Sequence, residues 1–207
     1  HDRAEAWLKT VLAQATVPLN SADGRVRDNA LLDLVHKTQL ENGKADVSLA
    51  PMFSTRVQIP AGPITVRDAF AIYPYENTLA VLEVTGKDLR AALEHAAEYY
   101  NRYDFGKSDA PFVAGSMPGY NFDIAQGVSY TVDVLKPVGQ RVENLSWRGR
   151  PLQDDKKLRV AVSNYRVNGG GGFDMFVGKP ILYRSELPTR DLLMDQLRKQ
   201  KTVGNTK

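Results

Sequence analysis

Apolar positions along the chain follow two periods, and the change from one to the other separates expected helices from expected strands. A helical period occurs in five segments, residues 2–15, 28–43, 65–70, 85–100 and 188–199. Short buried runs or strict alternation occur in six segments, residues 46–50, 78–84, 127–135, 141–149, 158–164 and 181–184. Helices and strands are intermixed, so the pattern predicts an α+β domain: a single domain with one mixed β-sheet and helices packed against it.

Capping and turn residues predict where several of these elements begin and end. Asp28 is expected to cap the second helix, and Gly43 to end it. Thr65 stands three residues before an aspartate, which is the spacing of a capping box, and Thr85 begins the longest clear helix with the same spacing. These signals predict four well-defined helix boundaries.

Two regions have a less regular pattern. The alternating runs 127–135 and 141–149 are bounded by turn residues and predict a hairpin. Residues 101–126 have little periodicity and therefore predict a loop. A loop of this length is unusual, which favours a functional or lid segment. The tail after Lys199 is expected to be frayed.

The segment from 163 to 176 differs from the rest of the chain. It places Tyr165 directly after a predicted strand, followed by four consecutive glycines, Gly169 to Gly172. Ordering four glycines costs much backbone entropy. The segment is therefore a flexible surface loop, a place where another group approaches the backbone closely, or a loop that needs positive φ angles. The spacing around Gly178 and Lys179 excludes a phosphate-binding P-loop, because a phenylalanine stands where the first glycine is required.

Composition narrows the classes of function. A chain of 207 residues with 43% hydrophobic and 25% charged residues is ordinary for one globular domain. The net charge of +3 comes from scattered residues, so we do not expect a nucleic acid polymer as partner. No run approaches the roughly 20 apolar residues of a membrane span. The sequence has no cysteine, and its histidines, His1, His36 and His95, form no metal-binding motif, so no metal site is expected within it. His36, beside an apolar helix face, is expected to be a packed or rim residue and not a ligand.

Four motifs in order resemble one family: ITVRDAFAIYPYENTLAVLEVTGKDLRAALEH (64–95), YNFD (120–123), RVENLSWRGRPL (141–152) and VSNYRVNGGGGF (162–173). They resemble the C-terminal substrate-recognition domain of the 5′-nucleotidase family. The YPYEN and YNFD forms are most similar to the 2′,3′-cyclic-nucleotide 2′-phosphodiesterase/3′-nucleotidase branch. The resemblance covers about residues 20–176.

The resemblance implies a division of labour between two domains. An N-terminal metallophosphatase domain, expected as the partner within the same protein, holds two divalent metal ions and the catalytic groups. Residues 20–207 would then be a nucleotide-binding domain without a cofactor of its own, and residues 1–19 the end of an interdomain linker helix. The start at His1 suggests an excised fragment. Alone, the domain is expected to bind a nucleotide or nucleoside without hydrolysing it, and the whole protein to be periplasmic, secreted or on the cell surface.

The resemblance also assigns the binding residues. Tyr75 and Tyr165 are the two aromatic side chains between which the base stacks, an arrangement that tolerates different bases. The other expected contacts are Asn77, the glycines Gly169, Gly170 and Gly171, and a phosphate-binding arginine, either Arg56 or Arg25.

Two departures from the family pattern leave other functions open. The family loop GGD ends in an acid, and Gly171 stands in that place; the family stretch NGGGIR is replaced by APMFSTR, which carries Arg56. One alternative is a non-catalytic nucleotide-binding or surface-interaction module with a degraded pocket. Another is that the intact protein hydrolyses a different phosphoester, such as a nucleotide sugar.

Overall fold

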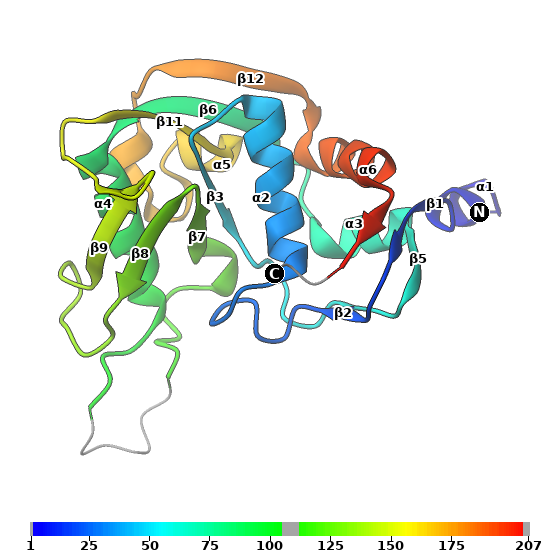
Figure 1. Cartoon of the computed structure of the whole chain (residues 1–207), viewed down its shortest axis with the longest axis horizontal. Coiled ribbons are helices and arrows are strands. Elements are labelled where there is room, and N and C mark those ends of the chain that lie inside the picture. The colour runs from blue at the N-terminus through cyan, green and yellow to red at the C-terminus, as the bar shows by residue number, and fades with distance from the viewer. Residues whose placement is uncertain (1, 105–111, 205–207) are drawn as a thin grey trace.

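A computed structural model of the chain describes residues 2–104 and 112–204. Its centre is a five-stranded sheet in which β11 and β3 run parallel and the other neighbours antiparallel (Figure 1). The strands follow the order β12 (Ile181–Pro188), β6 (Thr78–Thr85), β11 (Lys157–Ser163), β3 (Val47–Pro51) and β7 (Asp123–Gln126). The predicted α+β class, with a mixed sheet and packed helices, is confirmed.

Helices cover both faces of this sheet, with α4 (Gly86–Ala96) on one face and α2 (Ala30–Gly43) with α6 (Thr189–Gln200) on the other. Side chains alternate between the two faces along a strand. Leu82 of β6 accordingly belongs to the apolar core that contains the α4 side chains, whereas Val81 packs in a cluster with Leu192 of α6. The central strands are therefore buried on both sides, as their continuous apolar runs predict.

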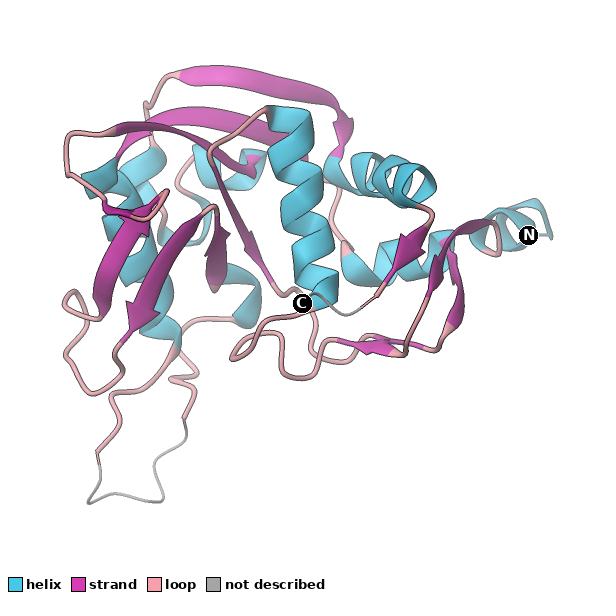
Figure 2. Cartoon of the chain, in the orientation of Figure 1, coloured by secondary structure: helices cyan, strands magenta, loops and turns pink. Residues whose placement is uncertain are grey.

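Smaller sheets extend the domain on either side (Figure 2). One has the order β13 (Thr202–Val203), β1 (Val11–Ala15) and β5 (Gly62–Thr65). A second contains the predicted hairpin and has the order β10 (Arg150–Pro151), β9 (Val142–Trp147) and β8 (Val128–Val132). The remaining pair is β2 (Leu19–Asn20) with β4 (Gln58–Ile59). These accessory sheets are additional to the single sheet that the pattern predicts.

The helix predicted over residues 2–15 is wrong in its second half. The helix α1 (Asp2–Leu8) ends early, and the residues that follow form β1. Leu12, Ala13 and Ala15 of β1 are buried between two neighbouring strands. The spacing of apolar residues in this segment is compatible with a helix, but pairing with strands that are distant in the sequence makes it a strand.

Two other expectations about irregular segments are corrected. The tail after α6 was expected to be frayed, but residues Thr202–Val203 form β13, which pairs in parallel with β1. Within the segment 101–126, residues 119–121 form the short helix η2 (Gly119–Asn121), and the last four residues form β7. The part of the proposed lid at residues 105–111 lies outside the described residues.

Of the four predicted helix boundaries, three are confirmed and one is corrected, and α2 ends at Gly43 as predicted. Capping boxes begin both α3 (Val66–Ile72) and α4. The cap of α2 is Asn29 instead of Asp28, since the Asn29 side chain accepts a hydrogen bond from Leu31 N–H at 3.1 Å. The described residues also form four further short helices: η1 (Ala97–Tyr99), α5 (Asn164–Val167), η3 (Gly170–Gly172) and η4 (Asp174–Phe176). Among the described residues, no helix has both the length and the apolar character needed to cross a bilayer.

Candidate functional site

Three strands of the central sheet meet at the edge of one cavity. β3 and β11 are parallel, so their carboxyl ends lie at the same edge, and the antiparallel strand β6 begins there. Leu79 at the start of β6 pairs with Ser163 at the end of β11. Beyond this pair, Asn164 Oδ1 accepts a hydrogen bond from Thr78 N–H at 3.1 Å and ties the two segments together. The residues that precede β6 and follow β11 are thereby brought side by side.

The cavity at this edge has a volume of about 300 Å³. Its aromatic lining consists of Phe53, Tyr73, Tyr75, Tyr120 and Tyr165. Its polar lining consists of Gln39, Asn77, Asp123, Ser163 and Arg166. Ligand cavities commonly combine apolar walls with a few polar groups in this way.

The predicted pair of tyrosines lies at this cavity, together with Asn77. Tyr75 and Tyr165 are 43% and 46% exposed, so each offers part of its ring to a ligand. The ring of Tyr75 is supported by Phe53, whose centroid lies 5.2 Å away, and by Tyr120 at 6.3 Å. Tyr73 is 1% exposed, and burial raises the pKa of its hydroxyl to about 12, which keeps it neutral. Tyr73 is therefore a buried wall of the cavity, whereas Tyr75, Tyr165 and Tyr120, which is 44% exposed, offer accessible ring surface to a ligand.

A buried ion pair closes the floor of the cavity. Arg166 donates two hydrogen bonds to Asp123, at 3.0 Å from Nε and 2.7 Å from Nη2. Burial raises the pKa of the Asp123 carboxyl, and the bonds from Arg166 act in the opposite direction. Arg166 also donates to the backbone oxygens of Tyr120 and Gly170. The guanidinium thus joins three segments that line or support the cavity.

The glycine loop supports the cavity from outside its lining. Gly169 and Gly171 have φ angles of 79° and 74°, which favour glycine. A Cβ atom on Gly170 would lie 2.5 Å from the Tyr165 ring, and one on Gly171 would lie 2.4 Å from Asn121 Oδ1. Glycine is needed here because neighbouring side chains approach the backbone closely. The predicted ligand contacts of Gly169, Gly170 and Gly171 have no counterpart among the residues that line the cavity.

The structure brings neither predicted arginine into the cavity lining. The Arg25 guanidinium donates to Met52 O at 3.0 Å and to the Tyr99 hydroxyl at 3.0 Å. Those bonds hold the segment that carries Phe53, a wall of the cavity. Arg56 is exposed, and its backbone N–H donates to Ser54 Oγ at 3.2 Å. A phosphate role for either side chain stays a prediction.

Sequence reasoning did not assign several residues that the structure places here. Tyr120 and Asp123 belong to the YNFD motif, and Arg166 directly follows Tyr165, so all three lie in segments that the family resemblance identifies. The motifs do not show that Arg166 and Asp123 form an ion pair. Phe53 lies in the stretch that departs from the family pattern. Within the described residues, no three side chains of His, Cys, Asp or Glu are grouped so that they could hold a metal ion.

The sequence of the chain matches one family model and several known proteins. The family model described as "5′-nucleotidase, C-terminal domain" matches residues 11–178. The trifunctional nucleotide phosphoesterase protein YfkN of Bacillus subtilis is 34% identical over 159 residues, which cover 70% of this chain and 11% of that protein. The 2′,3′-cyclic-nucleotide 2′-phosphodiesterase/3′-nucleotidase of Haemophilus influenzae is 32% identical over 156 residues, 68% of this chain and 23% of that protein.

A solved structure also matches the fold. The crystal structure of the 5′-nucleotidase precursor from Thermus thermophilus superimposes with a TM-score of 0.77 and 27% identity, over 99% of this chain and 40% of that one. The chain therefore spans less than half the length of each of these three proteins.

Proposed function

The chain belongs to the family of 5′-nucleotidase C-terminal domains, and on that premise we propose that it recognises the substrate of a two-domain nucleotide phosphohydrolase by stacking the base between Tyr75 and Tyr165. One observation carries the proposal. Of the three half-exposed tyrosine rings that line the cavity, Tyr75 and Tyr165 come from segments that the paired strands β6 and β11 bring side by side. A base stacked on an aromatic ring gains about 1–3 kcal/mol whatever its hydrogen-bonding pattern.

Polar groups around the rings can form hydrogen bonds with the parts of a nucleoside that do not stack. Asn77 and Ser163 can donate to and accept from the edge of a base or the hydroxyls of a ribose. The volume of about 300 Å³ is at the lower end of the range for ligand cavities, about 300–1,000 Å³, and suits a nucleoside better than a large ligand. We extend the proposal to substrates of the 2′,3′-cyclic-nucleotide 2′-phosphodiesterase/3′-nucleotidase kind, because similar proteins carry that name. A periplasmic or secreted location belongs to the same proposal.

The hydrolytic step is proposed to lie in a separate metallophosphatase domain. The described residues do not fit the two divalent metal ions that the family resemblance implies, because no suitable cluster of ligands exists among them. What this chain contributes is the binding and orientation of the nucleoside portion. Holding a substrate in a fixed position is a recognised source of rate enhancement.

The 207-residue chain alone is expected to show no hydrolysis of 2′,3′-cyclic AMP, 3′-AMP or 5′-AMP with added Mn²⁺, Co²⁺, Mg²⁺ or Zn²⁺. A two-metal site requires clustered ligands that the described residues lack. Phosphate release would be measured at each metal, with adenosine binding measured on the same sample as proof of an intact cavity. Turnover that tracks stoichiometric metal binding would contradict the proposed division between domains.

A second expectation concerns phosphate. If Arg56 contributes by charge, 3′-AMP should bind more weakly as salt is added, while adenosine should show little change. Arg56→Ala should then remove the difference between the two ligands and leave adenosine affinity unchanged, because the side chain is exposed and lies outside the cavity lining. Calorimetric titrations at two salt concentrations test this. Equal salt dependence for both ligands in the wild-type chain would exclude phosphate recognition by Arg56.

The alternative of a surface-interaction module, whose pocket no longer binds nucleosides, is tested by the same adenosine titration. A degraded pocket predicts no saturable binding of adenosine or cytidine, whereas the stacking proposal predicts binding of both. Binding of neither base by a folded chain would favour the alternative.

A further inference from the structure

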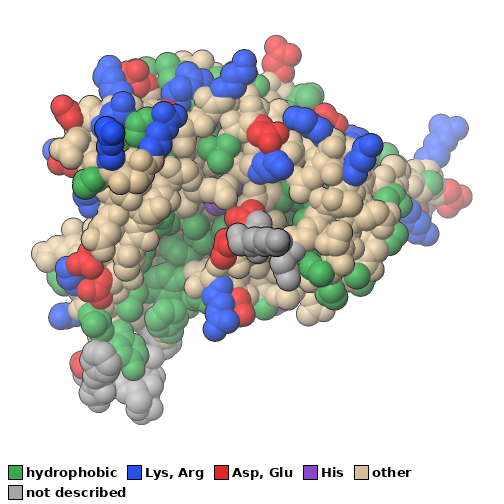
Figure 3. Space-filling model, viewed as in Figure 1, with side chains coloured by type: hydrophobic (Ala, Val, Ile, Leu, Met, Phe, Trp, Pro, Cys, Tyr) green, Lys and Arg blue, Asp and Glu red, His purple; other side chains and the backbone are tan. Residues whose placement is uncertain are grey.

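A second groove lies on the other side of β7 from the tyrosine cavity. Asp123 lines the tyrosine cavity, while its neighbours Phe122 and Ile124 line the groove, since successive side chains of a strand point in opposite directions. The groove has a volume of about 540 Å³. In Figure 3, hydrophobic side chains gather in a hollow on this face, between the lobe of β8 and β9 and the body of the domain. Aromatic rings of Tyr100 and Tyr130 and the side chain of Val132 contribute to its walls.

The groove wall contains one buried polar side chain with an unused hydrogen-bonding atom. His36 of α2 is 1% exposed, and its Nδ1 lies 2.9 Å from Ser48 Oγ. Its other ring nitrogen, Nε2, has no hydrogen-bond partner among the described residues. Buried polar atoms are rarely left unpaired in native proteins, so this nitrogen requires an explanation.

The hydrogen-bond network determines which kind of partner Nε2 lacks. Ser48 Oγ already accepts a hydrogen bond from Gln39 Nε2 at 2.9 Å. Among the described residues the Ser48 hydroxyl has no other hydrogen-bond acceptor, so its one hydrogen points to His36 Nδ1, which accepts it. The imidazole proton therefore lies on His36 Nε2, and the missing partner is an acceptor.

The charges around the groove indicate a neutral ligand. Two arginines, Arg25 and Arg27, and two aspartates, Asp28 and Asp33, line it and balance one another. Burial lowers the pKa of His36 to about 3, so its ring carries no charge near neutral pH. An ionic ligand would find no net counter-charge here.

We propose that this groove binds a neutral, flat aromatic molecule whose carbonyl oxygen accepts a hydrogen bond from His36 Nε2. The aromatic walls supply contact area for a ring, and the buried N–H supplies the single directional contact. The site is separate from the tyrosine cavity and does not rest on the function proposed for that cavity.

Benzamide is a suitable probe because it is neutral, flat and carries a carbonyl oxygen. With ¹⁵N-labelled histidine in the 207-residue chain, benzamide should shift the His36 Nε2 resonance saturably. Benzylamine has the same ring, a positive charge and no acceptor, and it should bind roughly tenfold more weakly, the ratio that one net hydrogen bond supplies. Equal binding of the two probes, or no saturable shift with benzamide up to its solubility limit, would overturn the proposal.

A pair of variants locates the probe. Val132→Trp should fill the groove from the half-buried face of β8 and abolish the benzamide shift. Val138→Trp, at an exposed position outside the groove lining, should leave the shift unchanged. Both variants are checked for an unchanged fold by their amide spectra. Excess adenosine should not displace benzamide, because the two ligands are expected at different sites. If adenosine displaced benzamide and Val132→Trp had no effect on the shift, benzamide would bind in the tyrosine cavity and the second site would be refuted.

Discussion

Arg166→Met is expected to lower the free energy of unfolding by about 3–5 kcal/mol, the usual cost of removing one partner of a buried ion pair. The side chains of Arg166 and Asp123 are 3% and 2% exposed. Removing the guanidinium leaves a buried carboxylate whose compensating bonds are gone, and burial already raises the pKa of that carboxyl. Urea denaturation followed by circular dichroism measures the change.

Two further variants separate the ion pair from other effects. Arg198→Met removes an arginine from a surface pair with Asp195, in which the side chains are 49% and 63% exposed, and should cost less than about 1 kcal/mol. The double variant Arg166→Met with Asp123→Leu should be more stable than Arg166→Met alone, because it no longer buries an unpaired charge. An Arg166→Met effect no larger than that of Arg198→Met would show that the buried pair is not a stabilising element.

Through its hydrogen bonds, the same arginine connects the buried ion pair to the segments that carry the cavity tyrosines. Arg166 joins β7 through Asp123, the η2 segment through Tyr120 O, and the glycine loop through Gly170 O. Tyr165 is the residue before Arg166 and packs against Gly170. A chain that loses Arg166 should therefore lose nucleoside affinity under conditions in which it is still folded.

The parts of the site that the sequence could predict are those marked by local motifs. Tyr75 and Asn77 precede a strong strand pattern, and Tyr165 follows another. Once both strands lie in one sheet, the ends of the strands bring these residues together. The capping boxes at Thr65 and Thr85 were equally predictable, because their partners are three residues away.

The parts that could not be predicted depend on partners far away in the sequence. Arg166 and Asp123 are separated by 43 positions, and nothing local distinguishes a buried, paired arginine from a solvated one. Arg25 stays a predicted phosphate contact, and the bonds of its guanidinium to Met52 O and the Tyr99 hydroxyl could not be read from the sequence because both partners are distant. The β1 segment was expected to be helical because its strand partners, β5 and β13, lie elsewhere in the chain.

Tyr165→Ala is expected to weaken adenosine binding by about 1–3 kcal/mol, or roughly 5- to 150-fold, the contribution of one stacked base. Tyr165→Phe should keep most of the affinity, since the ring provides the stacking surface. Tyr75→Ala should have an effect of similar size, because Tyr75 offers a comparable exposed fraction to the same cavity.

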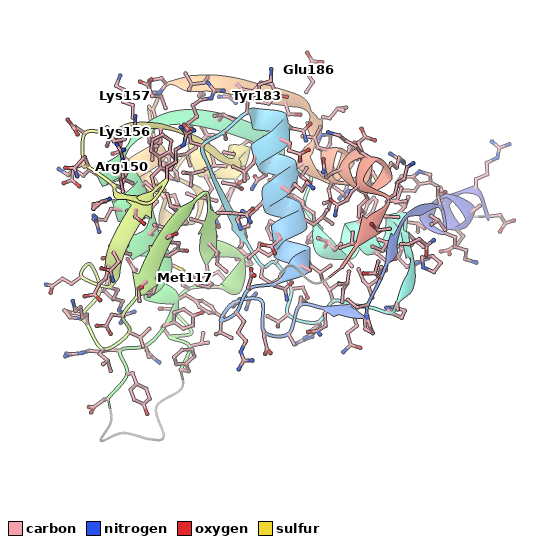
Figure 4. All side chains as sticks on the ribbon, in the orientation of Figure 1. Met117, Arg150, Lys156, Lys157, Tyr183 and Glu186 are labelled. Carbon is pink, nitrogen blue, oxygen red and sulfur yellow. The ribbon has the colours of Figure 1, made fainter. Side chains whose placement is uncertain are left out.

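Tyr183→Ala provides the matched control for this prediction. Tyr183 is a partly exposed tyrosine on β12 (Figure 4). It is not among the residues that line the cavity. Its removal deletes the same side chain without deleting a stacking surface, so adenosine affinity should be unchanged. Titrations with adenosine and cytidine should show parallel losses for Tyr165→Ala, because stacking does not depend on the hydrogen-bonding edge of the base. If Tyr165→Ala bound both nucleosides as well as Tyr183→Ala does, Tyr165 would be a surface residue and the base would have to be held elsewhere.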